Sequence, residues 1–106
     1  MTLNMTSSNS ISVTVEYFGP AKQYTNDKSQ DNIQLDTDSA NLNQLLIQLT
    51  PLYNSDFVEY IKKSCGLALN GEYQTLDRTI SVEEFGKEVV LTDGSELVIV
   101  PPVSGG

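Results

Sequence analysis

Near its C-terminus the sequence has an uninterrupted apolar segment rich in β-branched residues, Leu97-Val98-Ile99-Val100, which restricts the possible folds more than any other segment. Apolar runs of this kind are typical of strands covered on both faces, so we expect a central strand rather than an edge strand. Pro101 and Pro102 end it, because proline cannot donate a backbone hydrogen bond to a neighbouring strand. Residues 11–17 alternate between apolar and polar side chains, which predicts a strand with one buried face. We place the last strand beside this first one.

Two helical segments are predicted between these strands. Leucines recur at helical spacing over residues 42–49, with Asp38 or Ser39 available as the N-cap. Residues 56–64 carry apolar side chains on one face and lysines in the last turn, with Ser55 as a candidate N-cap. Both apolar stripes are interpreted as core.

The remaining segments are shorter or ambiguous. Residues 32–35 alternate again and can return as the hairpin partner of the first strand. Gly66 is a candidate C′ residue of the second helix, and residues 67–69 read as a strand. Asn70-Gly71 predicts a tight turn, because both residues tolerate positive φ. Residues 74–91 fit helical turns in one part and a strand in another, so both interpretations stay open.

At 106 residues the chain has the length of one domain. The order of its predicted elements, without internal repeats, indicates an α+β domain over residues 11–100, with helices on one face of a mixed sheet. This is the β-grasp, or ubiquitin-like, arrangement. Residues 1–10 are predicted to be a disordered polar leader, and residues 101–106 a flexible tail that ends in Gly-Gly.

The chain is strongly acidic, with 14 Asp and Glu against 6 Lys and Arg and a formal net charge of −8. Nucleic acid and anionic membranes are therefore not expected partners. The sequence has no His, and its single Cys65 has no Cys or His companion, so we expect no metal site and interpret Cys65 as a buried apolar filler. Residues 1–10 lack the regions of a signal peptide, and no run is long enough to span a bilayer, which favours the cytosol.

The terminal pair Gly105-Gly106 carries chemistry that the side chains lack. It follows the stiff Pro101-Pro102 stem, and the residues after Val100 can reach roughly 20 Å at about 3.3 Å per residue. Without Cβ atoms, the two glycines can enter a narrow cleft and leave the terminal carbonyl open to attack. The ionised carboxylate of Gly106 can attack the α-phosphate of ATP without a base, which gives an acyl adenylate open to sulfur or nitrogen nucleophiles. We therefore interpret the chain as a substrate for other proteins' active sites.

At this point the sequence resembles a family. The ending Val100-Pro101-Pro102-Val103-Ser104-Gly105-Gly106, with the preceding residues 93–99, is similar to the C-terminal signature of the molybdopterin synthase small subunit family. Individually weaker similarities continue at residues 15–21, 42–49 and 69–73, so that the resemblance covers about residues 11–106. The polar leader and residues 74–91 depart from the family pattern.

The resemblance implies a sulfur carrier of molybdenum cofactor synthesis. A ubiquitin-activating-like adenylyltransferase would use ATP to adenylate Gly106, and a sulfur-transfer step would convert it to a thiocarboxylate. The tail residues Pro101, Pro102, Val103, Ser104 and Gly105 would then insert into the molybdopterin synthase large subunit, where sulfur reaches cyclic pyranopterin monophosphate and builds the dithiolene. The implied complex is a heterotetramer of two small and two large subunits, with the catalytic groups on the large subunit and no cofactor bound permanently to this chain.

Other classes of protein share this terminal chemistry. A ubiquitin-like modifier would end with Gly106 in an isopeptide bond to a target lysine, although the stiff Pro101-Pro102 stem disfavours this role. A carrier for thiazole synthesis or tRNA thiolation would use the same thiocarboxylate. A plain binding module with an incidental Gly-Gly ending is disfavoured by the rarity of that ending. Partner contacts are expected from apolar groups near the tail, Val103 and Phe18, although Phe18 also fits the core.

Overall fold

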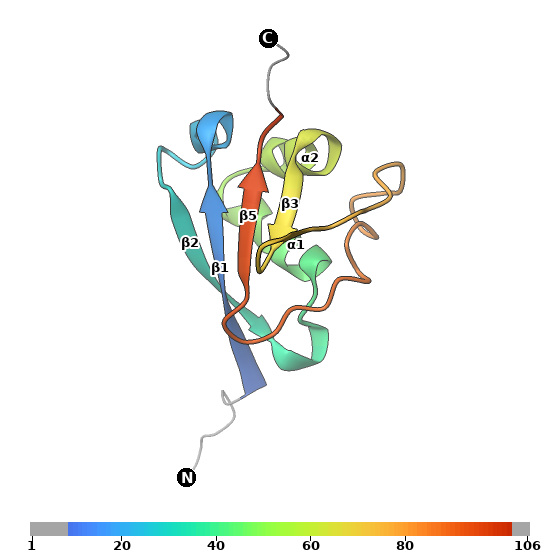
Figure 1. Cartoon of the computed structure of the whole chain (residues 1–106). Coiled ribbons are helices and arrows are strands. Elements are labelled where there is room, and N and C mark those ends of the chain that lie inside the picture. Colours follow the sequence, from blue (N-terminus) through green and yellow to red (C-terminus); the bar gives the residue numbers. More distant parts are fainter. Residues whose placement is uncertain (1–8, 103–106) are drawn as a thin grey trace.

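The computed structural model describes residues 9–102 (Figure 1). The elements are, in chain order, β1 (Ser10–Tyr17), the 3-10 helix η2 (Gly19–Gln23), β2 (Gln30–Asp36), the 3-10 helix η3 (Thr37–Ser39), α1 (Leu42–Leu52), α2 (Ser55–Ser64), β3 (Gly66–Leu69), β4 (Glu72–Tyr73) and β5 (Glu96–Val100). The predicted strands and helices are therefore present. Of the expected leader over residues 1–10, residues 1–8 lie outside the described residues, as do the tail residues 103–106, whereas Ser10 is already the first residue of β1.

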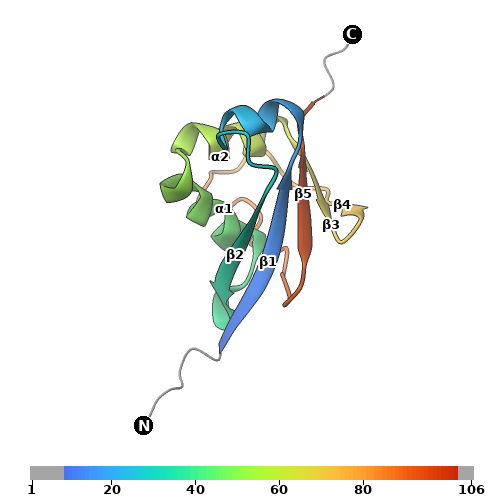
Figure 2. The ribbon, with the colours of Figure 1, turned by 90° about the vertical axis from the view of Figure 1, so that its left-hand side faces the viewer.

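The five strands form one mixed sheet in the order β2-β1-β5-β3-β4. β5 lies at its centre, parallel to β1 and antiparallel to β3, and β1 pairs with β2 as a hairpin. The predicted central position of β5 and its place beside β1 are confirmed. Both helices pack on one face of the sheet, as the side view in Figure 2 shows. This arrangement is the predicted α+β β-grasp fold.

One expectation about β5 is wrong, because the strand is not covered on both faces. Leu97 and Ile99 are fully buried against the helices, whereas Val98 and Val100 point to the other face and are only half-buried. β-Branched side chains are favourable at both buried and half-exposed strand positions. A run of them therefore does not show that a second layer covers the other face of the sheet. The face of the sheet opposite the helices is therefore open.

The helix caps differ from those predicted. Asp38 and Ser39 are taken up by η3, so α1 begins later, and the Asn41 side chain accepts a hydrogen bond from the Gln44 amide at 2.9 Å. Asn54, rather than Ser55, caps α2 by accepting from the Phe57 amide at 2.8 Å. Asparagine, serine and aspartate are about equally good N-cap residues, so residue preference alone could not show which of several adjacent candidates caps each helix.

Gly66 is also not a left-handed C′ residue. The C-cap residue Cys65 is extended, and Gly66 enters β3 directly. In contrast, the predicted tight turn at Asn70-Gly71 is confirmed, with φ values of 50° and 88°. The Asn70 amide donates to the Glu96 carbonyl at 2.8 Å, and the Glu96 amide donates to the Asn70 side chain at 2.9 Å. The turn is therefore fixed to the start of β5.

Residues 74–91, which the sequence left open, form neither a helix nor a strand, apart from an isolated bridge between Val90 and Asn41. The segment folds as successive turns and is anchored by the buried side chain of Phe85. The buried Asn43 amide on α1 donates to the carbonyls of Val82 and Phe85, both at 2.7 Å. These contacts make the segment part of the core.

Candidate functional site

The site begins at the stem of the predicted tail. Pro101, directly after β5, is buried, whereas Pro102 is exposed. The chain therefore leaves the body of the protein at Pro102, at the C-terminal end of the central strand. The other predicted tail residues, Val103, Ser104, Gly105 and Gly106, lie outside the described residues, so their roles stay predictions.

The open face of the sheet next to this stem is apolar. Strand register brings its outward side chains together, because Val98 pairs with Ala68 and Val100 with Gly66. Tyr73 on β4 pairs with Ala68, and its ring lies across Gly66, where a Cβ atom would stand only 3.0 Å from Tyr73 Cε1. Because residue 66 has no side chain, the Tyr73 ring can pack directly against the backbone of β3.

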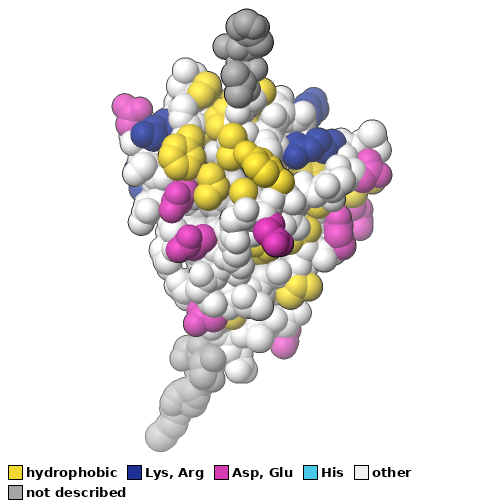
Figure 3. Space-filling model, in the orientation of Figure 1, with side chains coloured by type: hydrophobic (Ala, Val, Ile, Leu, Met, Phe, Trp, Pro, Cys, Tyr) yellow, Lys and Arg dark blue, Asp and Glu magenta, His cyan; other side chains and the backbone are white. Residues whose placement is uncertain are grey.

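Phe18 extends this surface beyond the end of β1. Its backbone is extended, and its side chain is 49% exposed, so the expectation that it could belong to the core is wrong. We call the surface made by these residues the outer patch: Phe18, Ala68, Tyr73, Val98 and Val100. Figure 3 shows the hydrophobic side chains gathered over the upper part of the open face, around the end of β5.

Charges of both signs lie near the outer patch: Figure 3 shows Lys or Arg side chains beside its upper part and carboxylates below it. The five described strands contain no Lys or Arg, whereas they carry carboxylates at Glu16, Glu72 and Glu96 near the patch. Glu16 is the register partner of Val98, Glu96 lies two residues before it on the same strand, and Glu72 adjoins Tyr73. The carboxylates near the outer patch therefore come from the strands, and the Lys and Arg side chains beside it come from other segments.

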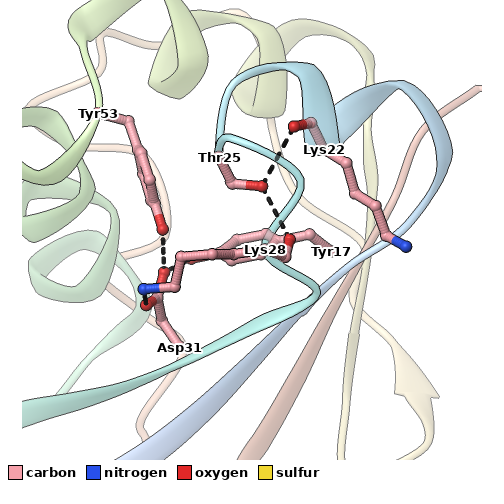
Figure 4. Close-up of polar contacts among 6 residues, drawn as sticks. All are labelled: Tyr17, Lys22, Thr25, Lys28, Asp31 and Tyr53. Carbon is pink, nitrogen blue, oxygen red and sulfur yellow. Dashed lines mark hydrogen bonds and ion pairs between the residues drawn. The ribbon is translucent and has the colours of Figure 1, made fainter.

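A polar cluster on the helix side holds the end of β1 in place (Figure 4). The Tyr17 hydroxyl donates to Asp31 Oδ2 at 2.8 Å, the Tyr53 hydroxyl donates to the same oxygen, and Lys28 Nζ lies 2.5 Å from Asp31 Oδ1. Burial alone would raise the pKa of Asp31, but the hydrogen bonds from Lys28, Tyr53 and Tyr17 outweigh it and lower that pKa. Asp31 is thus an ionised acceptor that connects β1, β2 and the end of α1.

Aromatic rings continue this cluster toward η2. The Tyr17 ring meets the Tyr53 ring edge-on at 6.1 Å, and the Tyr24 ring stacks on Phe57 at 4.9 Å and on Tyr60 at 5.3 Å. Tyr24 directly follows η2, so these contacts fix the turn that comes after Phe18. The segment that follows Phe18 is therefore packed against α2.

The one cysteine has no reactive character. Cys65 is buried, as predicted, and burial raises the pKa of its thiol to about 11. The thiol is therefore protonated at neutral pH and is a poor nucleophile. Within residues 9–102, no group of three or more His, Cys, Asp or Glu side chains is placed to hold a metal ion, and no helix is long and apolar enough to cross a membrane.

Comparison with protein families identifies the chain at this level. The model of the ThiS family matches residues 15–106, which include β1 from Val15 onward, the core, the stem and the terminal Gly-Gly pair. The chain belongs to the ThiS family. It is thus a member of a sulfur-carrier family, and the coarse functional class expected from its terminal chemistry is confirmed. Among curated proteins, none matches the sequence significantly.

Solved structures share the fold of this ThiS-family chain. A protein from Pyrococcus furiosus named as molybdopterin converting factor subunit 1 is 24% identical, with a TM-score of 0.59, covering 88% of this chain and 99% of that one. Small archaeal modifier protein 1 from Methanosarcina acetivorans is 22% identical, with a TM-score of 0.63 and coverage of 92% and 98%. The protein of the same name from Haloferax volcanii is 18% identical, with a TM-score of 0.65 and coverage of 90% and 99%. These similarities confirm the fold. The names of these proteins include both a molybdopterin converting factor subunit and a small archaeal modifier, which correspond to the sulfur-carrier and modifier roles considered from the sequence.

Sequence reasoning found the stem of this ThiS-family chain and named Phe18 as a possible partner contact, but it missed the rest of the surface beside the stem. Val98 and Val100 were assigned to a second covered face, and Tyr73 was not singled out. The one signal in the sequence is that none of the strand segments contains a Lys or Arg. The Asp31 cluster had no comparable signal, since its three partners are brought together only by the fold.

Proposed function

We propose that this ThiS-family chain is the sulfur carrier of molybdenum cofactor biosynthesis. The observation that carries the proposal is the extent of the family match, which continues to residue 106 and so includes the ending Pro101-Pro102-Val103-Ser104-Gly105-Gly106. The structural similarity to a protein named as molybdopterin converting factor subunit 1 favours this pathway among those that use sulfur carriers.

The proposed chemistry takes place at the C-terminal carboxylate. A carboxylate oxygen of Gly106 attacks the α-phosphorus of ATP. The bond between the α-phosphorus and the oxygen that bridges it to the β-phosphate breaks, and pyrophosphate leaves. A hydrosulfide-level sulfur donor then attacks the acyl carbon, and AMP leaves with the bonding electron pair. The product is a thiocarboxylate, whose sulfur is transferred to cyclic pyranopterin monophosphate in a second protein. ATP is consumed by the activating enzyme and is not a resident cofactor of this chain.

Two partners follow from this cycle. One is a ubiquitin-activating-like adenylyltransferase, and the other is the large subunit of molybdopterin synthase in a heterotetramer of two small and two large subunits. The buried Pro101 supports this proposal, because it fixes where the tail starts relative to the body of the protein. A partner that receives the tail therefore meets the same end of the sheet every time.

The test is the intact mass of the chain after coexpression with the adenylyltransferase. We expect the mass to increase by the difference between sulfur and oxygen, with the change located at Gly106 by fragmentation. The product should then convert cyclic pyranopterin monophosphate when the large subunit is added. A chain that carries the sulfur but supports only tRNA thiolation or thiazole formation would assign it to another sulfur-transfer pathway.

A second function is favoured by the similarity to the small archaeal modifier proteins. In this role the activated carbonyl of Gly106 would form an isopeptide bond with a lysine of a target protein. The same coexpression distinguishes the two roles, because recovery of the chain only as lysine conjugates would refute the carrier proposal. Recovery of both the thiocarboxylate and the lysine conjugates would show that the activated tail takes part in both reactions.

A further inference from the structure

Two cationic side chains meet at the C-terminal end of α2, and each binds the other's backbone. Lys62 Nζ donates to the Arg78 carbonyl at 3.0 Å, and Arg78 Nη1 donates to the Lys62 carbonyl at 2.9 Å and to the Ile61 carbonyl at 3.3 Å. The guanidinium carbon of Arg78 also lies 5.8 Å from the centre of the Phe85 ring. We call Lys62 and Arg78 the cation pair. Its contacts connect α2 to the 74–91 segment.

No carboxylate is paired with the cation pair. Within residues 9–102, the carboxylates that lie within 4 Å of a lysine belong to three other ion pairs, Lys28–Asp31, Lys63–Glu59 and Lys87–Glu84. Asp77 precedes Arg78 in the chain, but its Oδ1 accepts hydrogen bonds from the Thr79 amide at 2.9 Å and hydroxyl at 2.6 Å. The chain has 14 acidic and 6 basic residues, so two adjoining cations without a paired carboxylate are unexpected.

The burial of Lys62 makes this arrangement costly. Lys62 is only 8% exposed, and lysine is seldom buried to this degree without a counter-ion, because removing an ammonium group from water is unfavourable. The carbonyl end of a helix carries only about half a negative charge, which does not balance two cations. The Arg78 carbonyl accepts from the ammonium, which has three N–H donors. An anion bound at this point would supply the missing charge.

The cation pair also keeps donors that a ligand can use. Among the described residues, only Nη1 of the Arg78 guanidinium makes hydrogen bonds, which leaves Nε and Nη2 available. A guanidinium edge binds two oxygens of one carboxylate or phosphate group, and an ammonium adds a compact positive charge beside it. The donors of the cation pair therefore match an oxyanion with two or more oxygens.

The cation pair lies at the end of the sheet from which the stem leaves. α2 ends at Ser64, and two residues later Gly66 is the register partner of Val100, which directly precedes Pro101. Figure 3 shows Lys or Arg side chains beside the upper part of the outer patch, at this same end. A ligand of the cation pair is therefore bound close to the stem.

We propose that Lys62 and Arg78 form a binding site for an oxyanion, a carboxylate or phosphate group that Arg78 holds with its free edge while Lys62 balances the charge. Such a group has two sources. One is the chain's own C-terminal carboxylate, because the four residues after Pro102 can span about 13 Å. The other is a free phosphate-bearing molecule. The site goes beyond the proposed function, since neither ligand requires activation of Gly106.

A titration of the full chain with inorganic phosphate tests the site, followed by NMR of the backbone amides and arginine side chains at constant ionic strength. We expect saturable shifts at residues 62 and 78. Lys62→Met and Arg78→Gln should each raise the dissociation constant about tenfold or more, because each removes a charge-assisted contact. Lys63→Gln and Lys87→Gln are the matched controls, since they remove the same charge from exposed positions, and they should change it less than about twofold.

Two variants are needed because Arg78 also binds carbonyls at the end of α2. If Arg78→Gln does not fold, Lys62→Met still tests the site, since it keeps the arginine and its bonds to α2. Thermal unfolding of each variant checks that folding is retained.

A chain whose terminal carboxylate is replaced by an uncharged amide identifies the source of the oxyanion. If the amide form binds phosphate several-fold more tightly than the carboxylate form, the chain's own carboxylate competes for the site and is its ligand. If both forms bind phosphate equally, the ligand is a free phosphate group. If neither form shows saturable shifts at residues 62 and 78, or if Lys63→Gln weakens binding as much as Lys62→Met, the inference is overturned. The proposed function is unaffected by that result, because it is tested by the mass of the activated chain.

Discussion

Replacing Asp31 by alanine should destabilise the fold far more than an ordinary surface substitution. Asp31 Oδ2 accepts the hydroxyl of Tyr17, whose side chain is fully buried, and that of Tyr53. Without this oxygen the buried Tyr17 donor has no partner, which costs about 1–3 kcal/mol, and the partly buried Tyr53 adds roughly 1 kcal/mol. The total is about 2–4 kcal/mol. For a chain of this size, at about 4 °C per kcal/mol, the midpoint falls by on the order of 10 °C.

The assay is thermal unfolding at pH 7, followed by circular dichroism, for the wild type, Asp31→Ala, Asp31→Asn and Lys28→Ala. Asp31→Asn keeps one carbonyl acceptor and should be intermediate. Lys28→Ala removes only an exposed ion pair and should leave the midpoint nearly unchanged. If Asp31→Ala shifts the midpoint no more than Lys28→Ala does, the two hydroxyls have found other acceptors and the reasoning is refuted.

The same variants carry a pH test with a defined sign. The pKa of Asp31 is lowered in the folded protein, so its stabilisation is present above the unfolded value near 3.9 and is lost as pH falls through the folded pKa. The difference in unfolding free energy between wild type and Asp31→Ala should therefore be constant from neutral pH down to about pH 5 and shrink in stronger acid. A difference that grows on acidification would contradict the assignment of Asp31 as an ionised acceptor.

Three further predictions concern the tail, the core and the thiol. Deleting Gly106, or adding one residue after it, should abolish sulfur transfer in the synthase assay while the unfolding midpoint stays nearly constant, because terminal residues of a domain seldom carry folding stability. Phe85→Ala should lower the free energy of unfolding by about 3–5 kcal/mol in urea titrations, against almost no change for the exposed Val90→Ala, because Phe85 is buried. Cys65 should react with a thiol reagent only at the rate of global unfolding, and fast labelling of the native protein would contradict its burial.

Most of the fold could be predicted because its signals are local. The alternation over β1, the leucine spacing of α1 and the Asn70-Gly71 turn each depend on neighbours in sequence, and each is found in the structure. The position of β5 could be predicted as well, because few arrangements place a wholly apolar strand at an edge.

What failed depends on contacts between distant residues. Periodicity could not describe residues 74–91, because their shape is set by the hydrogen bonds from Asn43 and by the burial of Phe85 in the core rather than by their own pattern. The open outer face of β5 was missed because burial of Val98 depends on whether a second layer exists. For the candidate site, the sequence located the stem at Pro101 and Pro102, the reactive role of Gly106 stays a prediction, and the outer patch could be found only from the strand register.

The central place of β5 has a mechanical consequence. Its neighbours β1 and β3 hold it by ladders of hydrogen bonds that run across the strand direction. A pull applied at the end of β5 along the strand loads these ladders in shear, so that many bonds must give way together instead of opening one after another. A chain built this way should resist unfolding when force is applied at its stem, as when the stem is pulled into a narrow cleft or withdrawn from it.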